Sequence, residues 1–333
     1  MGHTGAVQIP SVQTGPHVWS ANELLADPAS WTHHLDEETI SELEAAAFGD
    51  THEELPNLDR LAATVTAGLL DGRGMIVVRG LAIDTYSEQT AERMLEVFGR
   101  RLGSLRPQNA SGHLIGHVRD VGADVTDPNT RIYQTSERQT FHTDSCDVVG
   151  LLCLRTAMQG GESMLASSST VYNQMLSRRP DLLARLFEPI ATDRRGEIPS
   201  GMKPWFEIPV FSWHRQHLTA MYQRQYIDSA KRFPEAPTPD EEYTAALDLF
   251  DSIANEPAVH VTMDFEPGDM QFVHNHSLLH DRMSFVDWPE PERRRHLLRV
   301  WVAIDGDREL PDVFAQRYGS VTVGDRGGIV VRG

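Results

Sequence analysis

The sequence predicts a mainly β protein with flanking helices (α+β), built on an antiparallel barrel or double-sheet jelly roll. Two observations predict this fold. From residue 113 onward, short apolar runs are separated by Gly, Pro, Asn and Asp, as is typical of short strands joined by turns. These runs do not alternate regularly with helical patterns, which argues against a doubly wound parallel sheet.

The first hundred residues are dominated by helical patterns. We expect residues 1–35, which are rich in Gly, Pro, Ser and Thr, to form an N-terminal arm or loosely packed extension. Asp36 is placed to cap a helix that ends at Gly49, a second amphipathic helix follows, and a third begins near Ser87. Met75–Arg79 is expected to be a short apolar strand between the second and third helices.

Eight further strands and two further helices are expected in the rest of the chain. The expected strands are His113–Val118, Gln139–Asp144, Val148–Arg155, Met164–Ser167, Pro209–Trp213, Val259–Phe265, Met270–Val273 and His296–Ile304. Helices are expected at 170–187 and 238–254. The second of these begins with a capping box at Thr238 and has Pro239 at the first helical position.

Length and charge limit the classes of function. The chain has 333 residues, of which 40% are hydrophobic, and we expect one domain over residues 36–310 followed by a C-terminal tail, residues 311–333. The net charge of −18 disfavours nucleic acid and membrane surfaces as partners. Cys146 and Cys153 are too few for a disulfide framework, and no run approaches the roughly 18 apolar residues of a membrane span. A cytoplasmic protein is expected.

Two groups of residues are candidate metal ligands. His142 and Asp144 are two apart, so on a strand they project from one face, as two ligands of one metal must. A solvated pair near a turn is the alternative. His274 and His276 form a rival pair, and His280 is expected just past their strand. One of these three histidines would complete a set of two histidines and one carboxylate, which suits Fe(II) and oxygen chemistry.

Two further motifs have both a structural and a functional interpretation. Arg295, Arg299 and Trp301 share one face of an expected strand. Two arginines facing inward would need carboxylates to meet them, whereas facing outward they would form an ordinary solvated edge. Gly160 and Gly161 form a turn that places the hydroxyl of Ser163 at the start of a strand, which by itself indicates only a hairpin.

In this order, the motifs resemble the taurine dioxygenase-like (TauD/TfdA) family of Fe(II)/2-oxoglutarate-dependent oxygenases. The resemblance covers about residues 75–305. It rests on Phe141–Asp144, Leu151–Arg155, Gly160–Ser163, Phe265–Asp269, Leu279–Arg282 and Arg295–Trp301. The fold that it implies is a double-stranded β-helix, a cupin-like jelly roll.

The resemblance also implies the iron ligands. His142 and Asp144 match the first two ligands of the family, and His280 matches the distal histidine. His274 and His276 then become residues of the core or residues behind the ligands.

For the cosubstrate, Arg295 matches the arginine that binds the far carboxylate of 2-oxoglutarate, a task suited to a planar guanidinium. Ser163 lies where many relatives have a threonine that bonds the same carboxylate. Arg299 matches a second arginine, which contacts either the cosubstrate or an anionic substrate. Asp281 stands where a glycine is common, and this leaves the outline of the pocket open.

The expected function is that of an Fe(II)- and 2-oxoglutarate-dependent dioxygenase. It would use O2 to hydroxylate a C–H bond of a small organic substrate and would release succinate and CO2; desaturation or ring closure are variants of the same chemistry. One alternative is a metal-assisted hydrolase or isomerase in which His274 and His276 hold a zinc-bound water. Another is a catalytically idle binding module.

The sequence leaves the primary substrate and the oligomeric state open. Arg138 and Thr140 share a face with His142 if that strand extends back far enough, and with Arg299 nearby they would suit an anionic substrate. A solvated loop position is the alternative for Arg138.

Lids over the pocket are expected in the loop-rich stretches 104–140 and 190–235. Within the second stretch, Arg224 and Tyr226 either face the pocket or hold a short helix.

Overall fold

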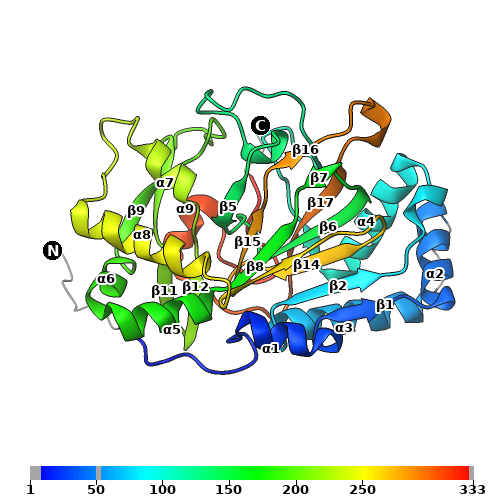
Figure 1. Ribbon diagram of the computed structural model, residues 1–333, viewed down its shortest axis with the longest axis horizontal. Coiled ribbons are helices and arrows are strands. Elements are labelled where there is room, and N and C mark those ends of the chain that lie inside the picture. The colour runs from blue at the N-terminus through cyan, green and yellow to red at the C-terminus, as the bar shows by residue number, and fades with distance from the viewer. Residues whose placement is uncertain (1–8, 50–53, 330–333) are drawn as a thin grey trace.

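Two β-sheets form the centre of the protein, which we describe from a computed structural model at residues 9–49 and 54–329. The larger sheet contains β1 (Thr32–His34), β2 (Met75–Arg79), β3 (Ser104–Leu105), β4 (Ile115–Val118), β6 (Val148–Arg155), β14 (Met270–His274) and β17 (His296–Ala303). The smaller sheet contains β5 (Gln139–His142), β8 (Ser163–Ser167), β13 (His260–Met263) and β15 (Leu278–Arg282). The sheets lie between two groups of helices (Figure 1).

The strand order shows how the chain builds the two sheets. The larger sheet has the order β1-β2-β14-β6-β17-β3, with β4 also paired to β17, and the smaller has the order β13-β8-β15-β5. The chain crosses from one sheet to the other between β5 and β6, between β6 and β8, between β13 and β14, and again between β14 and β15. Side chains from both sheets, including Val149, Leu165, Leu278 and Trp301, pack together in one cluster. This arrangement agrees with the predicted double-sheet jelly roll.

The first group of helices covers the outer face of the larger sheet. It consists of α2 (Glu37–Phe48), α3 (Pro56–Leu70) and α4 (Glu88–Leu102). In β17 the outward residues Leu298 and Val300 pack in one cluster with Phe98 of α4, whereas Arg299 and Trp301 point to the space between the sheets. The strand period of two therefore separates apolar packing from the polar interior of the jelly roll.

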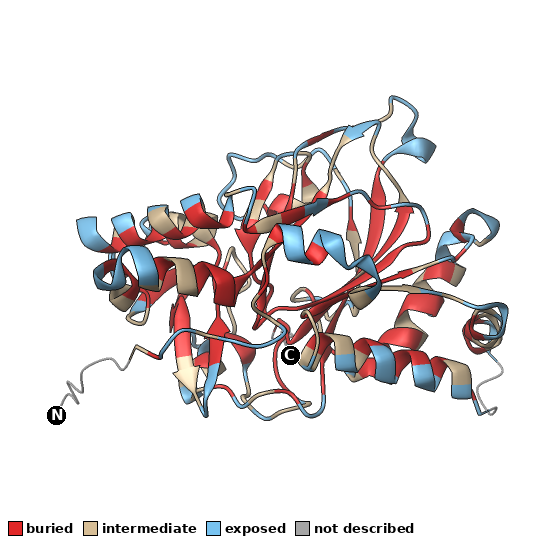
Figure 2. Cartoon of the chain, turned by 60° about the horizontal axis from the view of Figure 1, so that its bottom comes forward, coloured by how far each residue is buried: buried red, intermediate tan, exposed pale blue. Residues whose placement is uncertain are grey.

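The second group of helices covers the smaller sheet. It consists of α5 (Ser168–Arg178), α6 (Pro180–Arg185), α7 (Arg224–Ala230) and α8 (Glu241–Ala254). Three strand pairs lie outside the two sheets: β7 (Gln159–Gly160) with β16 (Phe285–Val286), β9 (Pro189–Asp193) with β10 (Trp205–Pro209), and β11 (Phe211–His214) with β12 (His217–Ala220). Phe141 and Leu279 of the smaller sheet pack against Tyr172 and Phe250 of this helical layer. Buried residues fill the central strands, while the outer faces of the helices are exposed (Figure 2).

The helix predictions are confirmed at the N-terminal end and corrected later in the chain. Asp36 and Ser87 cap α2 and α4 as expected. The helix expected at 170–187 is divided into α5 and α6 at Pro180, because proline cannot supply the backbone donor of a continuous helix. The last long helix begins at Glu241 rather than near Thr238, since the Asp240 carboxylate accepts the hydrogen bond that caps it.

Most predicted strands are present; two of them have different bounds from those expected, and β15 was not predicted as a strand. The strand expected to reach Asp144 ends at His142. His280, expected just past a strand, lies within β15, where it pairs with both β5 and β8. The strand expected at Pro209–Trp213 instead covers the end of β10 and the start of β11. In β15, Asp281 and Arg282 interrupt the apolar pattern that predicts a strand. They can be buried there because Arg138 and the Thr135 carbonyl, which are distant in sequence, meet their polar groups.

The N-terminal segment packs more closely than expected. Part of the predicted arm forms α1 (Ala21–Ala26), which begins with a capping box between Ser20 and Glu23. Trp19 is only 1% exposed and packs in the cluster between the sheets, so the described part of this segment is not a loose extension. Residues 1–8 and 330–333 lie outside the described residues, and the domain boundaries at 36 and 310 stay a prediction.

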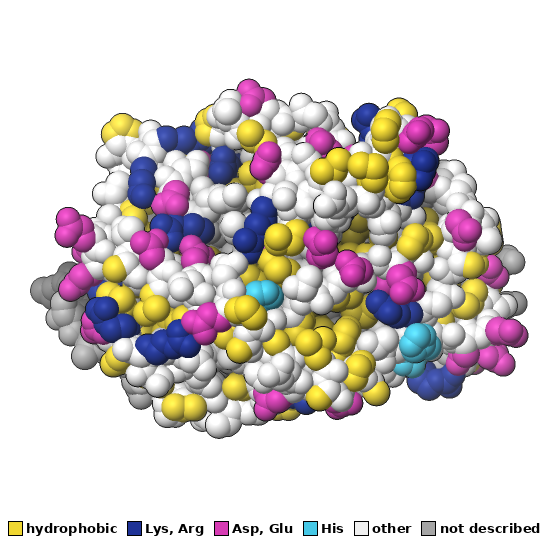
Figure 3. All heavy atoms as spheres, viewed as in Figure 1, with side chains coloured by type: hydrophobic (Ala, Val, Ile, Leu, Met, Phe, Trp, Pro, Cys, Tyr) yellow, Lys and Arg dark blue, Asp and Glu magenta, His cyan; other side chains and the backbone are white. Residues whose placement is uncertain are grey.

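Two observations bear on the expected partners. Within residues 9–49 and 54–329, no helix has both the length and the hydropathy of a membrane span. Acidic and basic side chains are interspersed on the face that Figure 3 shows, and this face carries no extended basic patch.

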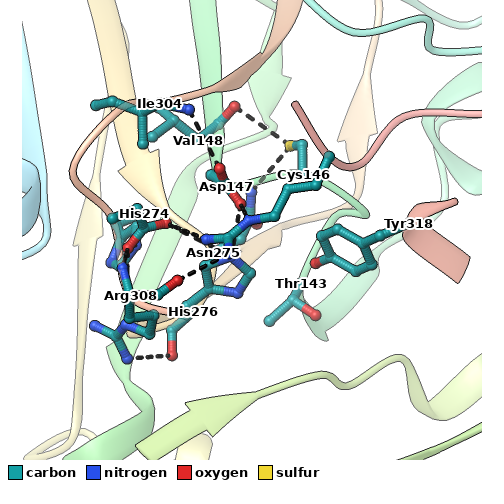
Figure 4. Close-up of polar contacts among 12 residues, drawn as sticks. Thr143, Cys146, Asp147, Val148, His274, Asn275, His276, Ile304, Arg308 and Tyr318 are labelled. Atoms are coloured by element: carbon teal, nitrogen blue, oxygen red, sulfur yellow. Dashed lines mark hydrogen bonds and ion pairs between the residues drawn. The ribbon is translucent and has the colours of Figure 1, made fainter. Parts of the chain in front are cut away.

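The C-terminal segment is fixed to the core by a buried ionic network. Arg326 is fully buried; its Nε donates to Asp147 Oδ1 at 2.7 Å and its Nη2 to Asp307 Oδ2 at 3.0 Å. His276 Nε2 lies 2.9 Å from Asp147 Oδ1, and the backbone N–H of Ile304 donates to the other oxygen of Asp147 (Figure 4). The short helix α9 (Ala315–Tyr318) lies in this docked segment.

Replacing Arg326 with Ala is expected to destabilise the protein by about 3–5 kcal/mol, because two buried carboxylates would lose their cationic partner. Urea unfolding measures this change. The matched control is Arg100→Ala, which breaks an exposed pair with Glu96 within α4 and is expected to cost about 0.5 kcal/mol or less. If the two variants lost the same free energy of unfolding, the buried network around Arg326 would contribute no more to stability than an exposed ion pair.

Candidate active site

Three residues that the sequence singled out converge at one end of the smaller sheet. His142 is the last residue of β5 and pairs with His280 of β15, while Asp144 lies in the loop that follows β5. Asp144 Oδ1 is 4.0 Å from His142 Nε2, and Asp144 Oδ2 is 3.9 Å from His280 Nε2. One potential ligand atom from each of the three side chains lies within 4.8 Å of the other two.

The protonation states of these groups suit a divalent metal. Burial lowers the pKa of both histidines, that of His280 to about 3, so both imidazoles are neutral. His142 Nδ1 lies 2.9 Å from the carbonyl oxygen of Thr140; by donating to it, Nδ1 leaves the lone pair on Nε2. Burial alone would raise the pKa of Asp144, but the positive charge of Arg299 beside it holds the pKa below its usual range. Two neutral imidazoles and a carboxylate can therefore bind a metal without losing protons.

Residues of β17 and its neighbours orient the Asp144 carboxylate. Arg299 Nη1 donates to Asp144 Oδ2 at 3.1 Å, and the indole N–H of Trp301 donates to the same oxygen at 2.8 Å. Arg299 is itself fixed by Gln108, whose Oε1 accepts from Nε at 2.7 Å. The expected inward face of Arg295, Arg299 and Trp301 is therefore observed, and Arg299 contacts the candidate ligand carboxylate.

A cavity between the sheets adjoins these three residues; we call it the Arg295 cavity. Its lining includes Tyr133, Gln139, His142, Asp144, Val149, Leu151, Ser163, Phe265, Gln271, His280, Asp281, Arg282, Arg295, Leu297 and Arg299. The cavity combines apolar walls with a few convergent polar groups, as is typical of ligand sites.

Arg295 is a buried cation without a carboxylate partner. Its exposed fraction is 4%, its Nη1 has no hydrogen-bond partner, and in the part of the chain that the structure describes no carboxylate lies within ion-pairing distance. Burial lowers the pKa of Arg295 to about 10. Gly161 has φ +81°, and a Cβ there would lie 3.1 Å from Arg295 Nε, so the glycine turn lets this arginine pack closely. An anion that enters the cavity would satisfy this guanidinium.

Ser163 and Gln271 occupy the same cavity. The Ser163 hydroxyl donates to Gln271 Oε1 at 3.2 Å, so it lies within the pocket as the resemblance implied. The sequence reasoning missed Gln271, although its place in the apolar strand β14 is a signal that its amide is turned toward a polar interior.

A β-bulge changes which residues of β5 face the site. His142 pairs with His280, but Gln139 pairs with Arg282, so β5 carries an extra residue relative to β15. Gln139 therefore joins His142 at the cavity and donates from Nε2 to His142 Nε2 at 2.8 Å. Thr140, expected to share the face of His142, does not line the described cavities beside this site. The sequence pattern alone contains no signal for the bulge.

Arg138 also lies away from the cavities, because its side chain is held by Asp281. Arg138 Nε is 3.0 Å and Nη2 is 2.6 Å from Asp281 Oδ2, and Nη2 also donates to Asn255. This pairing shows how the buried carboxylate of Asp281 is accommodated at this position. The placement does not support the predicted contact between Arg138 and a substrate.

The rival histidine pair is already occupied by protein groups. His274 Nε2 lies 3.0 Å from Asp307 Oδ1, and His276 is bonded to Asp147, in the network that Arg326 completes. A zinc-bound water held by these two histidines would have to displace Arg326, so the hydrolase alternative lacks an open site there.

A third group, Glu88, His117 and His296, also has ligand atoms close together. Glu88 of this group is exposed but His296 is fully buried, and Arg155 donates to Nδ1 of His296 at 3.1 Å. Of the three groups in the described residues, the one with His142 and His280 adjoins the cavities between the sheets.

A second cavity meets the first at His142 and Asp144; we call it the Arg317 cavity. Its lining is Arg131, Tyr133, Gln139, His142, Thr143, Asp144, Ser145, Thr192, Phe206, Met221, Gln223, Tyr226, Arg299, Trp301 and Arg317. Both stretches expected to hold lids thus contribute to it. Of the two residues left open there, Tyr226 faces the cavity, whereas Arg224 forms ion pairs with three aspartates around α7 and α8.

Comparison with known proteins identifies the family. The profile described as "Taurine catabolism dioxygenase TauD, TfdA family" matches residues 39–301. The chain belongs to the TauD/TfdA family. FR-33289 synthase of Streptomyces rubellomurinus is 33% identical over 316 residues, covering 90% of this chain and 92% of the relative. The taurine hydroxylase-like protein SAT17 of Stachybotrys chartarum is 29% identical over 289 residues, covering 80% of this chain and 73% of the relative.

A solved structure shows the same fold. An asparagine oxygenase in complex with Fe(II), 3-hydroxyasparagine and succinate superposes with a TM-score of 0.61 at 18% identity, over 81% of this chain and 93% of that chain. The predicted cupin-like double-stranded β-helix is confirmed. As a member of this family, the chain is a non-haem Fe(II)- and 2-oxoglutarate-dependent dioxygenase that uses O2, as the sequence resemblance implied. The neutral histidines, the ionised Asp144 and the unpartnered Arg295 fit these cofactors.

The pairing of Arg138 with Asp281 gives a stability prediction. Arg138→Ala is expected to destabilise the metal-free protein by about 1.5–3 kcal/mol, because buried Asp281 would lose charge-assisted hydrogen bonds. In a protein that already carries Asp281→Asn, Arg138→Ala should lower the free energy of unfolding by less than half as much. Urea unfolding of the wild type, the two single variants and the double variant measures this difference. An unchanged stability of Arg138→Ala together with a higher KM for a substrate would instead restore the substrate role.

Proposed function

We propose that His142, Asp144 and His280 bind one Fe(II), and that the enzyme hydroxylates a C–H bond of a small organic substrate. The observation that carries the proposal is the convergence of these three ligand atoms within 4.8 Å where two cavities meet. Two histidines and one carboxylate leave three positions of an octahedral metal open, which suits a metal that must take both a cosubstrate and O2. When bound, the iron supplies oxygen activation coupled to the decarboxylation of 2-oxoglutarate to succinate and CO2.

The Arg295 cavity is the proposed site of 2-oxoglutarate. Arg295 binds the far carboxylate with its planar guanidinium, and the Ser163 hydroxyl turns from Gln271 to donate to the same group. The walls of Val149, Leu151 and Phe265 exclude water around this ion pair and so strengthen it.

The remaining polar residues position the reacting groups. Arg299 and Trp301 hold the Asp144 carboxylate in the orientation needed to face both histidines. The Arg317 cavity borders His142 and Asp144 from the other side, so we place the primary substrate there. Arg299 lines both cavities, and its charge acts on cosubstrate and substrate alike.

Substrate-stimulated release of succinate tests the reaction class. The wild-type enzyme with Fe(II), 2-oxoglutarate and O2 is expected to release succinate and CO2 in equal amounts when a candidate from a panel of small anionic compounds is added. Mass spectrometry of the product separates hydroxylation, which adds one oxygen, from desaturation or ring closure, which removes two hydrogens. Turnover of a panel compound without succinate would favour a hydrolase.

The proposal extends to the compartment and the partners. Cys146 and Cys153 are both free and buried, which suits a reducing, cytoplasmic environment. The net charge of −18 supports a small-molecule partner rather than nucleic acid.

Metal content tests the ligand assignment. Each of the variants His142→Ala, Asp144→Ala and His280→Ala is expected to weaken Fe(II) binding by at least roughly 100-fold. Losing a residue that only hydrogen-bonds to a ligand costs up to about 100-fold, and losing the ligand itself should cost more. Anaerobic equilibrium dialysis with iron analysis measures this. His117→Ala is the matched control, because it removes a histidine from another group of possible ligands. If His276→Ala lost iron while His280→Ala retained it, the distal ligand would be misassigned.

Cosubstrate affinity tests the role of Arg295. Arg295→Leu is expected to weaken 2-oxoglutarate binding roughly 10- to 150-fold while iron binding is retained, because a charge-assisted bidentate pair is lost. Arg295→Lys should restore only part of the affinity.

Arg299→Leu is the comparison in the same titrations, done by anaerobic calorimetry. Because it contacts Asp144, its loss should weaken iron binding by about 10- to 100-fold. The opposite pattern, in which Arg299→Leu removes 2-oxoglutarate binding and Arg295→Leu does not, would exchange the two roles.

A further inference from the structure

The Arg317 cavity contains one arginine that no carboxylate neutralises. Arg131 Nη1 lies 3.2 Å from both carboxylate oxygens of Glu197, and Arg299 Nη1 lies 3.1 Å from Asp144. For Arg317, no carboxylate lies within ion-pairing distance among residues 9–49 and 54–329. One positive charge at this cavity is therefore unmatched by the protein.

The surroundings of Arg317 fix its position and leave donors for a ligand. Its side chain is only 8% exposed, and its Nε donates to the Ser145 hydroxyl at 2.7 Å. The guanidinium carbon lies 5.5 Å from the centre of the Phe206 ring. Nε is the guanidinium atom with a hydrogen-bond partner in the described chain, so Nη1 and Nη2 are left to bind a ligand.

Other polar groups of the same cavity have unused hydrogen-bonding capacity. Because the Ser145 oxygen accepts from Arg317, its own hydrogen is free to donate. The hydroxyls of Thr192 and Tyr226 line the cavity beside it. Gln223 is 6% exposed, and its buried Oε1 has no partner. A cation surrounded by hydroxyl donors is the arrangement that recognises an oxyanion.

Arg317 reaches this place from a part of the chain beyond the family match, which ends at residue 301. It lies in α9, and the segment that follows returns to the loop of Asp144. Gly328 N–H donates to the Ser145 carbonyl at 2.7 Å, Gly327 N–H donates to the Tyr318 carbonyl at 3.0 Å, and Arg326 is anchored by the buried aspartates. The C-terminal segment thus presents a cation to the cavity from a rigid support.

We propose that Arg317 binds an oxyanion group of the primary substrate, with the Ser145 hydroxyl as a second donor. This inference rests on the proposed function, because it takes the Arg317 cavity as the substrate site. The substrate class is a small organic acid: a phosphate, phosphonate, sulfonate or carboxylate. Neither Fe(II) nor 2-oxoglutarate, as placed above, neutralises Arg317, so the charge of Arg317 remains for the substrate.

The location of the oxyanion also limits the reacting carbon. Ser145 follows Asp144 directly, and their Cα atoms are therefore about 3.8 Å apart. An acid group bound by Arg317 and Ser145 holds the neighbouring carbon atoms against the wall formed by His142 and Asp144. Because His142, Asp144, Ser145 and Arg317 line one cavity, we expect the oxidised C–H bond to lie in the part of the substrate next to its acid group.

Binding of three probes of similar size tests the inference. Propylphosphonate, butyrate and neutral butyramide are titrated by anaerobic calorimetry into enzyme loaded with Fe(II) and 2-oxoglutarate. At least one of the two anions is expected to bind about tenfold or more tightly than butyramide, and Arg317→Gln should weaken that anion roughly 10- to 150-fold. Arg317→Lys should keep part of the preference, which separates charge from packing. The matched control, Arg100→Gln, changes the net charge by the same amount at an exposed site and should leave the affinities for all three probes unchanged.

The outcomes separate this inference from the proposed function. The stronger of the two anions shows whether the site prefers a tetrahedral or a planar acid. Unchanged anion affinity in Arg317→Gln, with normal iron and 2-oxoglutarate binding, would overturn the inference and leave the proposed function intact. Equal binding of butyramide and both anions by the wild type would overturn it too. Failure of the wild type to bind iron or 2-oxoglutarate would instead remove the proposed function.

Discussion

Charges buried between the two sheets need partners of opposite charge, since leaving a charge unpaired in the protein interior costs several kcal/mol. The protein meets this constraint with pairs that join distant segments. Arg326 is met by Asp147 and Asp307, and Asp281 is met by Arg138. Four buried arginines of the described residues lack a carboxylate partner. Arg194 and Arg282 donate to backbone carbonyls instead, whereas Arg295 and Arg317 border cavities. Arg295 and Arg317 are therefore the proposed binding places of anionic ligands.

The geometry of the proposed iron site depends on strand pairing as well as on residue identity. Pairing of β5 with β15 brings His142 opposite His280, and the end of β5 frees Asp144 to turn toward both. The carboxylate is then fixed from the other sheet by Arg299 and Trp301. Each sheet thus contributes part of one site, and the two cavities that meet there are the proposed sites of the cosubstrate and the substrate.

The segments that flank the family match are part of the structure that supports this site. Trp19 packs between the sheets near the N-terminal end of the chain. At the other end, the segment that carries Arg317 and Arg326 holds the loop from Asp144 to Asp147. A scaffold shared across the family can therefore differ in substrate through residues that lie outside the shared core.

Sequence patterns determined those features of the protein that depend on neighbouring residues or on ordered motifs. Local patterns predicted the helix caps at Asp36 and Ser87 and the alternation of side chains in β17, because strand and helix periods depend on neighbouring residues. The order and spacing of motifs identified His142, Asp144 and His280. Tertiary structure decided what depends on distant partners. The bulge that exchanges Thr140 for Gln139, the pairing that turns Arg138 to Asp281 and the delivery of Arg317 to the cavity each join segments far apart in sequence, and local patterns carry no information about which distant segments meet.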